Sequence, residues 1–573
     1  SPDVLGISCY IWNWEWSKKL AQEVKKRNPS TLIVMGGPQV PIWSDGFFQS
    51  HPYVDILAHG EGEVTFANIL RERLRENPDY SRVRGITFNR NGVSVRTGEQ
   101  PRATEKGIDK KSNPTPYLEE IVSPYLFGIF EELMKAHPEL GFNATSETHR
   151  GCPYSCEFCD WGSATYQHVD RFSDERVKAE YEWISKHKIP FVYNADANYM
   201  LFPEDEGLNR YIIELNQRTG FPKHLRANWA KNSQERIFMA ARELNAAGMD
   251  MGITIALQSL HDKTLEVIKR KNIEWDIELH KYNDARIPTY TELILPLPEE
   301  TYETFVKGLE TLLNNGLHTG INIYQCMLLP NSGMSHPAYI KKYGIVEMDS
   351  PILQNHSTPG TDSIQERTRY AIATDSMPLE DFKRAFLYGW AIQTFHSQGL
   401  TQDIAIYLKQ QGVSYRDFYG ALLSEKPDTV AGREVAITSR SLEKVLNGNN
   451  GNGQHKGIFL RRFFNLLGYG SNNGQWGKVN RKYGNIVWPF EELSFLNIMT
   501  GDRDIFYKQV QDMVKRRFGV VLPDEAIQEQ IARLRTPEDY NGDIREYAKR
   551  AVWFGRKSGA TFKENRESAG VST

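Results

Sequence analysis

The sequence predicts an α/β protein: a partial (β/α)6 TIM-like barrel, preceded by a Rossmann-like sheet and followed by a mainly helical C-terminal domain. Three observations predict it. Over residues 1–75, short apolar runs alternate with helical stretches and end in glycine or aromatic loops. Over residues 141–340, strand and helix patterns alternate with the spacing of βα units. Beyond residue 340, long helical stretches carry aromatic residues at turn spacing.

Composition narrows the class of protein. The 573 residues are 40% hydrophobic and carry a net charge of −3, which gives no electrostatic footprint for nucleic acid or an anionic membrane. No apolar run reaches the roughly 18 residues that span a bilayer. Five cysteines, three of them in one motif, argue against a secreted disulfide scaffold. We therefore expect a cytoplasmic protein that contacts neither nucleic acid nor membrane.

The N-terminal region, residues 1–75, predicts a parallel sheet with ligand-binding loops. The expected strands are residues 4–9, 31–35 and 54–58. They end in an aromatic loop, in Gly36-Gly37-Pro38-Gln39 and in His59-Gly60-Glu61. Ligands of such sheets bind at the carboxyl ends of the strands. The Gly-x-Gly-x-x-Gly fingerprint is missing, so a dinucleotide is disfavoured, and an ordinary Rossmann-like piece without a ligand remains an alternative.

Three further segments and the tail complete the expected organisation. Residues 76–140 are expected to form a linker with a small hairpin that turns at Asn91-Gly92. The barrel, 141–340, has six strand candidates: residues 143–148, 191–194, 225–228, 252–259, 290–295 and 319–328. Residues 341–556 are expected to be mainly helical, and 557–573 to be a polar tail.

A cysteine motif, C-x3-C-x2-C, follows the first barrel strand. Its members are Cys152, Cys156 and Cys159, in a loop of Gly, Pro and Ser residues. A structural zinc site takes four ligands, and a plain electron-transfer cluster usually takes four thiolates. A [4Fe-4S] cluster held by three thiolates keeps one iron open to a small molecule. A zinc site completed by a distant residue such as Cys326 is the alternative.

With Phe158 before its last cysteine and Asp160-Trp161-Gly162 after it, the motif resembles that of radical S-adenosylmethionine (SAM) enzymes. The resemblance implies that the three cysteines hold a [4Fe-4S] cluster whose open iron binds SAM. It also implies a six-stranded partial barrel. The cysteine loop would lie at the C-terminal mouth of that barrel, where barrel enzymes place their chemistry.

The same resemblance implies further SAM contacts. Asp196 occupies the position that contacts the methionine ammonium, and Gln258 and Ser259 end the fourth strand in a form of the family's G-x-Q-S pattern. Pro298 lies in a loop whose backbone packs near adenine. Trp161 is expected to contact adenine through its backbone, or else to be a core residue.

Several charged residues and thiols near these motifs are expected to have no chemical role. The run Lys269-Arg270-Lys271 is interpreted as solvated charge, and catalytic use of Glu299 or Glu300 is not expected. Cys9 and Cys326 lie in apolar strands, where buried inert thiols are the usual interpretation.

Residues 2–75 resemble the later strands of the cobalamin-binding domain that precedes many radical SAM domains. Two earlier strands are missing, so we expect this domain to be incomplete at its N-terminus, and without an Asp-x-His-x-x-Gly signature its axial ligand stays unassigned. The contacts that the resemblance implies are Tyr10, Trp12, Gly36, Gly37, Pro38 and Gln39 for the corrin, and Gly60 and Glu61 for the nucleotide groove. Alternatively, Trp12 and Trp14 cover a sheet edge.

The resemblance is to cobalamin-dependent radical SAM enzymes of the class B methyltransferase type. It implies methylation of an unactivated carbon of a small molecule, saccharide or peptide through a 5′-deoxyadenosyl radical and methylcobalamin. An external donor such as flavodoxin or ferredoxin would supply electrons. A rearrangement, cyclisation or epimerisation without methylation is the second hypothesis, and a non-catalytic cluster or cobalamin sensor is the third. The SAM motifs around Gln258 and Pro298 argue against a sensor.

Overall fold

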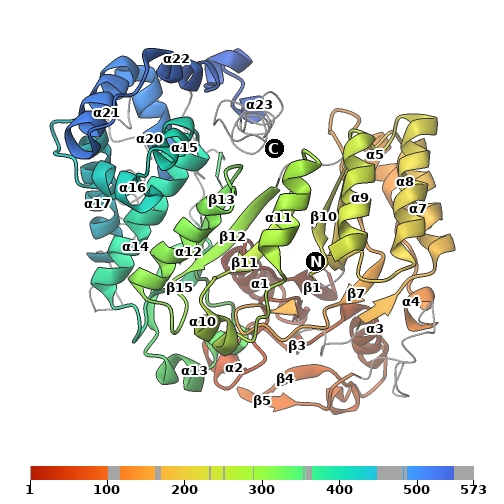
Figure 1. Cartoon of the computed structure of the whole chain (residues 1–573). Helices are drawn as coiled ribbons and strands as arrows, with labels where there is room; N and C mark the ends of the chain where they lie inside the picture. The colour runs from red at the N-terminus through yellow and green to blue at the C-terminus, as the bar shows by residue number, and fades with distance from the viewer. Residues whose placement is uncertain are drawn as a thin grey trace.

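The computed structural model has three parts (Figure 1). It describes residues 2–100, 116–161, 169–231, 234–249, 252–287, 289–352, 355–356, 364–447, 482 and 487–547. The expected polar tail, 557–573, lies outside these residues. None of the helices in the described ranges is long and apolar enough to span a membrane.

The first part is a five-stranded sheet in the order β1-β2-β3-β4-β5. Its strands are β1 (Val4–Ser8), β2 (Leu32–Gly36), β3 (Ile56–Ala58), β4 (Ile86–Arg90) and β5 (Val93–Arg96). The first three strands are parallel, as predicted, and all four apolar residues of β2 are buried because both faces of the sheet are covered. The hairpin predicted at Asn91-Gly92 forms, and it joins this sheet as an antiparallel edge instead of lying in a linker.

Helices α1 (Trp14–Arg27), α2 (Phe47–Ser50) and α3 (Gly62–Arg73) accompany this sheet. Two short helices, α4 (Pro116–Glu120) and α5 (Ile129–Ala136), then lead to the barrel. The connections from β1 and β3 into α1 and α3 therefore lie at the carboxyl ends of the strands.

The second part holds the six parallel strands that the sequence predicts, divided between two sheets. One sheet has the order β10-β9-β6 and the other β11-β12-β13. The strands are β6 (Ala144–Ser146), β9 (Phe191–Tyr199), β10 (His224–Trp229), β11 (Ile253–Gln258), β12 (Thr289–Leu295) and β13 (Ile321–Gln325). Within the described residues no ladder joins β10 to β11, so the predicted single barrel sheet is interrupted there.

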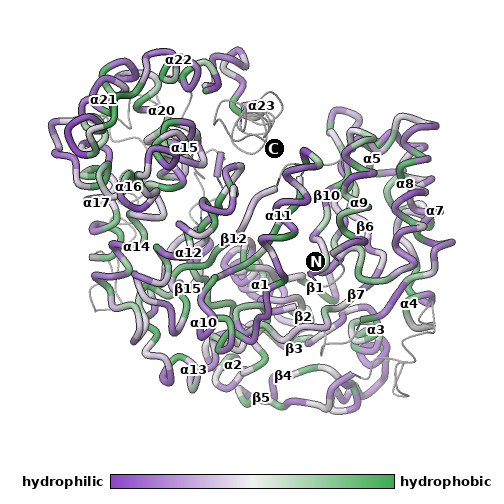
Figure 2. Tube along the Cα trace, in the orientation of Figure 1, coloured by the Kyte–Doolittle hydropathy of each residue, from purple (hydrophilic) through white to green (hydrophobic). Residues whose placement is uncertain are grey.

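Helices cover the outer faces of these two sheets (Figure 1). They are α7 (Asp174–Lys186), α8 (Asp205–Thr219), α9 (Gln234–Ala246), α10 (Asp262–Val267), α11 (Trp275–Asp284) and α12 (Tyr302–Asn314). The sequence at the start of α12 explains why that helix begins there, because Thr301 and Thr304 form a reciprocal capping box. Its apolar side, which includes Phe305 and Leu309, is buried. In Figure 2 the helices alternate polar and apolar segments, as one-sided burial requires.

The third part is mainly helical, as predicted. A helix α13 (Pro337–Lys342) and a hairpin of β14 (Val346–Pro351) and β15 (Arg367–Ala373) precede it. Its main helices are α14 (Leu379–Ala391), α15 (Gln402–Gln410), α16 (Tyr415–Leu423), α17 (Val430–Asn447), α20 (Phe490–Asn497), α21 (Arg503–Phe518) and α22 (Asp524–Ala532). One continuous apolar core runs from the barrel strands into these helices, so the second and third parts are packed as one body.

Candidate functional site

The cysteine motif lies between two short strands, β7 (His149–Gly151) and β8 (Val169–Arg171), that pair as a hairpin. Cys152 and Cys156 are buried, Cys159 is half-buried, and all are free thiols. The backbone of Glu157, between them, is fixed on both sides: its N–H donates to Ile268 O (3.0 Å) and its C=O accepts from Met334 N (2.8 Å). The loop is therefore held by the segment after α10 and by the turn after β13.

Two cations, half-buried Lys231 and buried Arg270, lie beside the thiols. Arg270 is only 8% exposed, its guanidinium donates to Ala256 O, and its Nη1 has no hydrogen-bond partner among the described residues. Burial lowers the pKa of both cations, and the charge of the neighbouring Cys156 opposes that shift. A cation next to a cysteine favours the thiolate form, which is the form that ligates metals.

For Arg270, the interpretation of the basic run as solvated charge is wrong. The Lys269 side chain is 59% exposed and pairs with Glu157 at 2.6 Å, and Lys271 is exposed. Arg270 turns inward to the cysteines because the chain reverses at Lys269, whose φ is +52°. The sequence analysis missed Lys231 and Arg270, and the preceding G-x-Q-S-like strand end was the only nearby signal.

The donor set around the thiols fits a sulfur-ligated cluster. Asn198 Nδ2 donates to Cys152 Sγ at 3.3 Å, and the backbone N–H of Trp161 bonds to Cys159 and opposes the rise in its thiol pKa that burial causes. Such hydrogen bonds tune a metal–thiolate centre. In the described part of the chain, no three His, Cys, Asp or Glu side chains are arranged for a single metal ion. A four-iron cluster distributes its thiolates over separate irons and needs a wider arrangement.

Asp196 lies in β9, and its carboxylate is fully buried. It accepts hydrogen bonds from the backbone N–H groups of Thr148 (2.8 Å) and His149 (3.2 Å) and from the Thr148 hydroxyl. These donors belong to the segment that enters the cysteine hairpin. The carboxylate is therefore occupied in shaping that segment, and the geometry does not support its predicted contact with a methionine ammonium.

Of the other SAM candidates, Gln258 reaches a cavity. The cavity has a volume of about 250 Å³ and lies at the interruption between β10 and β11. Lys231 and Arg270 also line it, together with Arg226, Asn228 and Glu292. Burial raises the pKa of Glu292, and the nearby cations, Arg226 foremost, oppose the rise.

The remaining SAM candidates lie outside this cavity. Pro298 is buried in the loop after β12, and the Trp161 side chain is 44% exposed, so it is not a core residue. The Ser259 hydroxyl donates to Glu300 Oε1 at 2.7 Å and accepts from His261 N at 3.1 Å. Ser259 therefore fixes the loop after β12 and does not face a ligand.

Glu300 predicts a pH effect on stability. Burial raises its pKa from 4.5 to about 8, so unfolding releases its proton between these two values and stability falls as the pH rises through that window. The slope is at most about 1.4 kcal/mol per pH unit. We expect Glu300→Gln to remove it, seen as a gain in thermal midpoint over the parent chain that grows from about pH 6 to about pH 8.5. Glu299→Gln, at an exposed neighbour, is the control, and equal slopes in all three chains would contradict the assignment.

A larger cavity, of about 930 Å³, lies at the carboxyl ends of β1, β2 and β3. Six of the predicted cobalamin contacts line it: Tyr10, Gly36, Gly37, Pro38, Gly60 and Glu61. Trp12 and Gln39 are not among its lining residues. Trp12 is 64% exposed, and its ring stacks on that of Tyr10 with the centroids 4.5 Å apart. The Gln39 side chain is buried.

The barrel part also contributes to this cavity, through Arg150, Asp160 and Asn331. Arg150 and Asp160 flank the cysteine motif, so the two predicted cofactor sites are neighbours. Arg150 pairs with Glu63 of α3 at 2.9 Å and with Glu147 at 3.0 Å, so the first of these pairs joins the first part of the chain to the cysteine hairpin. Asp160 belongs to the run that follows the cysteine motif, whereas no local pattern in the sequence pointed to a role for Arg150 or Asn331 in this cavity.

Position 37, in the wall of this cavity, requires a glycine. Its φ is +97°, and a Cβ there would stand 2.6 Å from Cys9 O and 2.9 Å from Cys9 N. We expect Gly37→Ala to lower the free energy of unfolding by about 2–4 kcal/mol, from backbone strain and overlap together. The control is Gly60→Ala, where φ is +71° but no atom lies within 4 Å, so only strain of about 1 kcal/mol is expected. Denaturant titration measures both, and equal losses would contradict the overlap.

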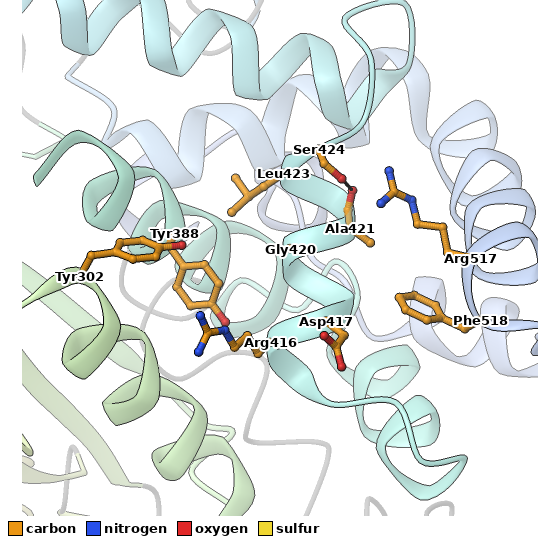
Figure 3. A pocket seen from close by; sticks show the side chains of 10 residues that line it. All are labelled: Tyr302, Tyr388, Arg416, Asp417, Gly420, Ala421, Leu423, Ser424, Arg517 and Phe518. Atoms are coloured by element: carbon orange, nitrogen blue, oxygen red, sulfur yellow. Dashed lines mark hydrogen bonds between the residues drawn. The ribbon is translucent and has the colours of Figure 1, made fainter. Parts of the chain in front are cut away.

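A third cavity, of about 670 Å³, lies on the helical domain, lined by residues of α12, α14, α16 and α21 (Figure 3). Tyr302, Tyr388 and Arg416 stand at one end, and Arg517 and Phe518 at the other. Arg416 is paired with Glu303 at 2.6 Å. The cysteine loop and the first sheet contribute none of its lining residues.

Comparisons with known proteins agree with the two-site arrangement. A family model described as the B12 binding domain matches residues 1–70. The chain is 40% identical over 451 residues to the cobalamin-dependent radical SAM methyltransferase TokK of Streptomyces tokunonensis, covering 77% of this chain and 64% of TokK. It is 38% identical to the 2-(S-pantetheinyl)-carbapenam-3-carboxylate methyltransferase of Streptantibioticus cattleyicolor, covering 75% of this chain and 63% of that enzyme.

The chain thus spans less than two thirds of either relative. A solved structure of TsrM from Kitasatospora setae overlaps loosely, with a TM-score of 0.47 and 15% identity over 68% of this chain and 79% of TsrM. The matches in sequence confirm the resemblance predicted from the cysteine motif and the strand-end loops: the chain is a relative of the cobalamin-dependent radical SAM enzymes.

Proposed function

We propose that the chain is a cobalamin-dependent radical SAM C-methyltransferase that acts on an unactivated carbon of a small molecule. One observation carries the proposal. The cavity at the ends of the first three strands extends to Arg150 and Asp160, which flank the three cysteines in the sequence. A cobalamin in that cavity and a cluster on the cysteines would therefore be neighbours, as transfer of a methyl group to a radical carbon requires.

The residues of the chain have separable roles in this proposal. Cys152, Cys156 and Cys159 would hold a [4Fe-4S] cluster. Arg270, with its unpartnered Nη1, would bind the carboxylate of SAM, and Gln258 would bind SAM from the same cavity. Burial of this region keeps water away from a reactive radical. When bound, the cluster and SAM supply a 5′-deoxyadenosyl radical, and cobalamin supplies the methyl group.

The proposed substrate class comes from the second relative, which is a 2-(S-pantetheinyl)-carbapenam-3-carboxylate methyltransferase. A carbapenam carboxylate is therefore the first substrate to test. Arg226, which lines the smaller cavity, is of the right charge for such an anion. We further propose that a flavodoxin or ferredoxin supplies electrons, and that the protein works in the cytoplasm, where thiols stay reduced.

The test is anaerobic reconstitution with iron, sulfide and cobalamin, followed by incubation with SAM, a reductant and the carbapenam carboxylate. Methylation yields S-adenosylhomocysteine, 5′-deoxyadenosine and a product heavier by one methylene. A rearrangement would yield no S-adenosylhomocysteine, and a sensor would bind the cluster without cleaving SAM. The proposal would be overturned if the chain did not bind the cluster, or if it did not bind cobalamin.

A further inference from the structure

One turn after β13, residues 331–335, contacts the walls of both proposed cofactor sites. At its start, the Asn331 side chain makes three hydrogen bonds to the loop after β2. Its Nδ2 donates to Pro38 O (2.8 Å) and Val40 O (2.9 Å), and its Oδ1 accepts from Ile42 N (2.9 Å). The amide thus bonds three backbone groups about 290 positions earlier in the chain, and Asn331 is only 7% exposed.

Three residues later, the same turn contacts the cysteine loop. The backbone N–H of Met334 donates to Glu157 O at 2.8 Å, and Glu157 stands between Cys156 and Cys159. Gly333 packs so closely on the Glu157 carboxylate that a Cβ would overlap it. Residues Gly333–Ser335 form a 3-10 turn, and Ser332 N donates to Leu329 O at 3.1 Å, so only a short hydrogen-bonded segment separates these two contacts.

The loop that Asn331 holds is the part of the cavity wall that strand pairing leaves free. Near Gly37 the loop is fixed to β1, because Gln39 N donates to Cys9 O at 3.1 Å. Pro38, Val40 and Ile42 line the cavity, as does Asn331 itself. On the other side of Ile42, Arg96 donates to its carbonyl at 2.6 Å. The backbone N–H of Ile42 depends on Asn331 for its bond.

We propose that Asn331 is a positioning residue that sets the place of the cobalamin cavity wall relative to the cysteine loop. The inference rests on the proposed function. A methyl transfer between two sites is sensitive to their separation, because misplacement by about 1 Å can cost roughly 100-fold in rate. The side-chain hydrogen bonds of Asn331 go to Pro38, Val40 and Ile42, and not to the cysteines, Gln258 or Arg270, to which the proposed function assigns SAM binding and cleavage.

The chain offers a matched control in Glu366, which also joins the first domain to a distant segment. Its carboxylate accepts from the N–H groups of Glu15 (2.8 Å) and Trp16 (3.0 Å) at the start of α1. None of these three residues lines the cavity. Glu366→Gln therefore weakens domain contact without releasing the loop 38–42.

Two variants test the inference: Asn331→Ala, which removes all three bonds, and Asn331→Asp, which turns the two donors toward carbonyls into acceptors. In the apoprotein, we expect Asn331→Ala to give faster hydrogen exchange at the Ile42 amide, Asn331→Asp to keep the acceptor of that amide, and both to leave exchange at the Met334 amide unchanged. In the reconstituted enzyme, we expect about a tenfold fall in methylated product per 5′-deoxyadenosine, with the rate of 5′-deoxyadenosine formation within about twofold of the parent. Glu366→Gln should match the parent in both measurements.

The outcomes separate the inference from the proposed function. If the parent chain fails to cleave SAM or bind cobalamin, the proposed function fails, while the exchange data still report on the loop. If the parent chain is active and Asn331→Ala keeps both the parent's exchange rate at the Ile42 amide and its ratio of methylated product to 5′-deoxyadenosine, the positioning role is wrong. An equal loss of SAM cleavage and methylation, or loss of the fold in both variants, would also overturn it, since Asn331 would then serve folding alone.

Discussion

Replacing Cys156 by serine is expected to abolish SAM cleavage, with a loss of at least about 10³-fold in 5′-deoxyadenosine formation. Serine keeps the size of the side chain but is a poor ligand for iron compared with a thiolate. Cys156 is buried, and its charge acts on both Lys231 and Arg270. Iron and sulfide content after reconstitution, together with the cluster's visible absorption, measures the loss directly.

Cys326→Ser is the matched control. Cys326 is also buried, but burial raises its pKa to about 12 and its neighbour is the Met334 sulfur. The neutral thiol is a packing group, so this variant should keep the full iron content and activity and lose only about 1–2 kcal/mol of stability. Equal loss of cluster in the two variants would show that the motif is not the ligand set.

The second large effect is expected at Arg270. Replacing it by methionine keeps the length of the side chain and removes the buried guanidinium beside the thiols. We expect a fall of about 100-fold in kcat/KM for SAM, about 2–3 kcal/mol, as is typical of losing a charged hydrogen-bond partner in a buried site. The cluster should still assemble, because the three cysteines and Asn198 remain.

Lys269→Met separates this effect from a general loss of positive charge. Lys269 is the adjacent residue, but its side chain is 59% exposed, against 13% for its partner Glu157, and an ion pair whose cation is solvated contributes roughly 1 kcal/mol. We expect its SAM kinetics to match those of the parent within about threefold. If the two variants lose activity equally, the buried guanidinium of Arg270 has no specific role in SAM binding.

The sequence could predict the features that depend on local pattern. Apolar runs ending in glycine loops predicted three parallel strands, and the loop residues Gly36, Gly37 and Gly60 meet in one cavity because carboxyl ends of parallel strands share an edge. The Asn91-Gly92 turn predicted its hairpin. The cysteine spacing predicted a cluster-binding loop; Arg150 and Asp160, which flank that loop, line the cavity, while the ligand role of the three thiols stays a prediction.

Features that depend on distant packing could not be predicted in this way. A run of three basic residues looks solvated, and only the reversal at Lys269 turns Arg270 inward. Asp196 follows a strand as a ligand would, yet its carboxylate is taken by backbone groups of Thr148 and His149. Asn331 has no motif around it, because the groups it bonds lie about 290 residues away.

The long-range contacts of the turn after β13 have a consequence for how the protein is made. The described strands of the first sheet all lie within residues 4–96, so they can pair early as the chain leaves the ribosome. The loop 38–42 in the wall of its cavity lacks its three bonds to the Asn331 side chain until that residue has been synthesised. A cobalamin that requires the fixed wall would therefore be captured late, when most of the chain already exists, and the order of synthesis would itself delay cofactor loading until the cysteine loop is present to meet it.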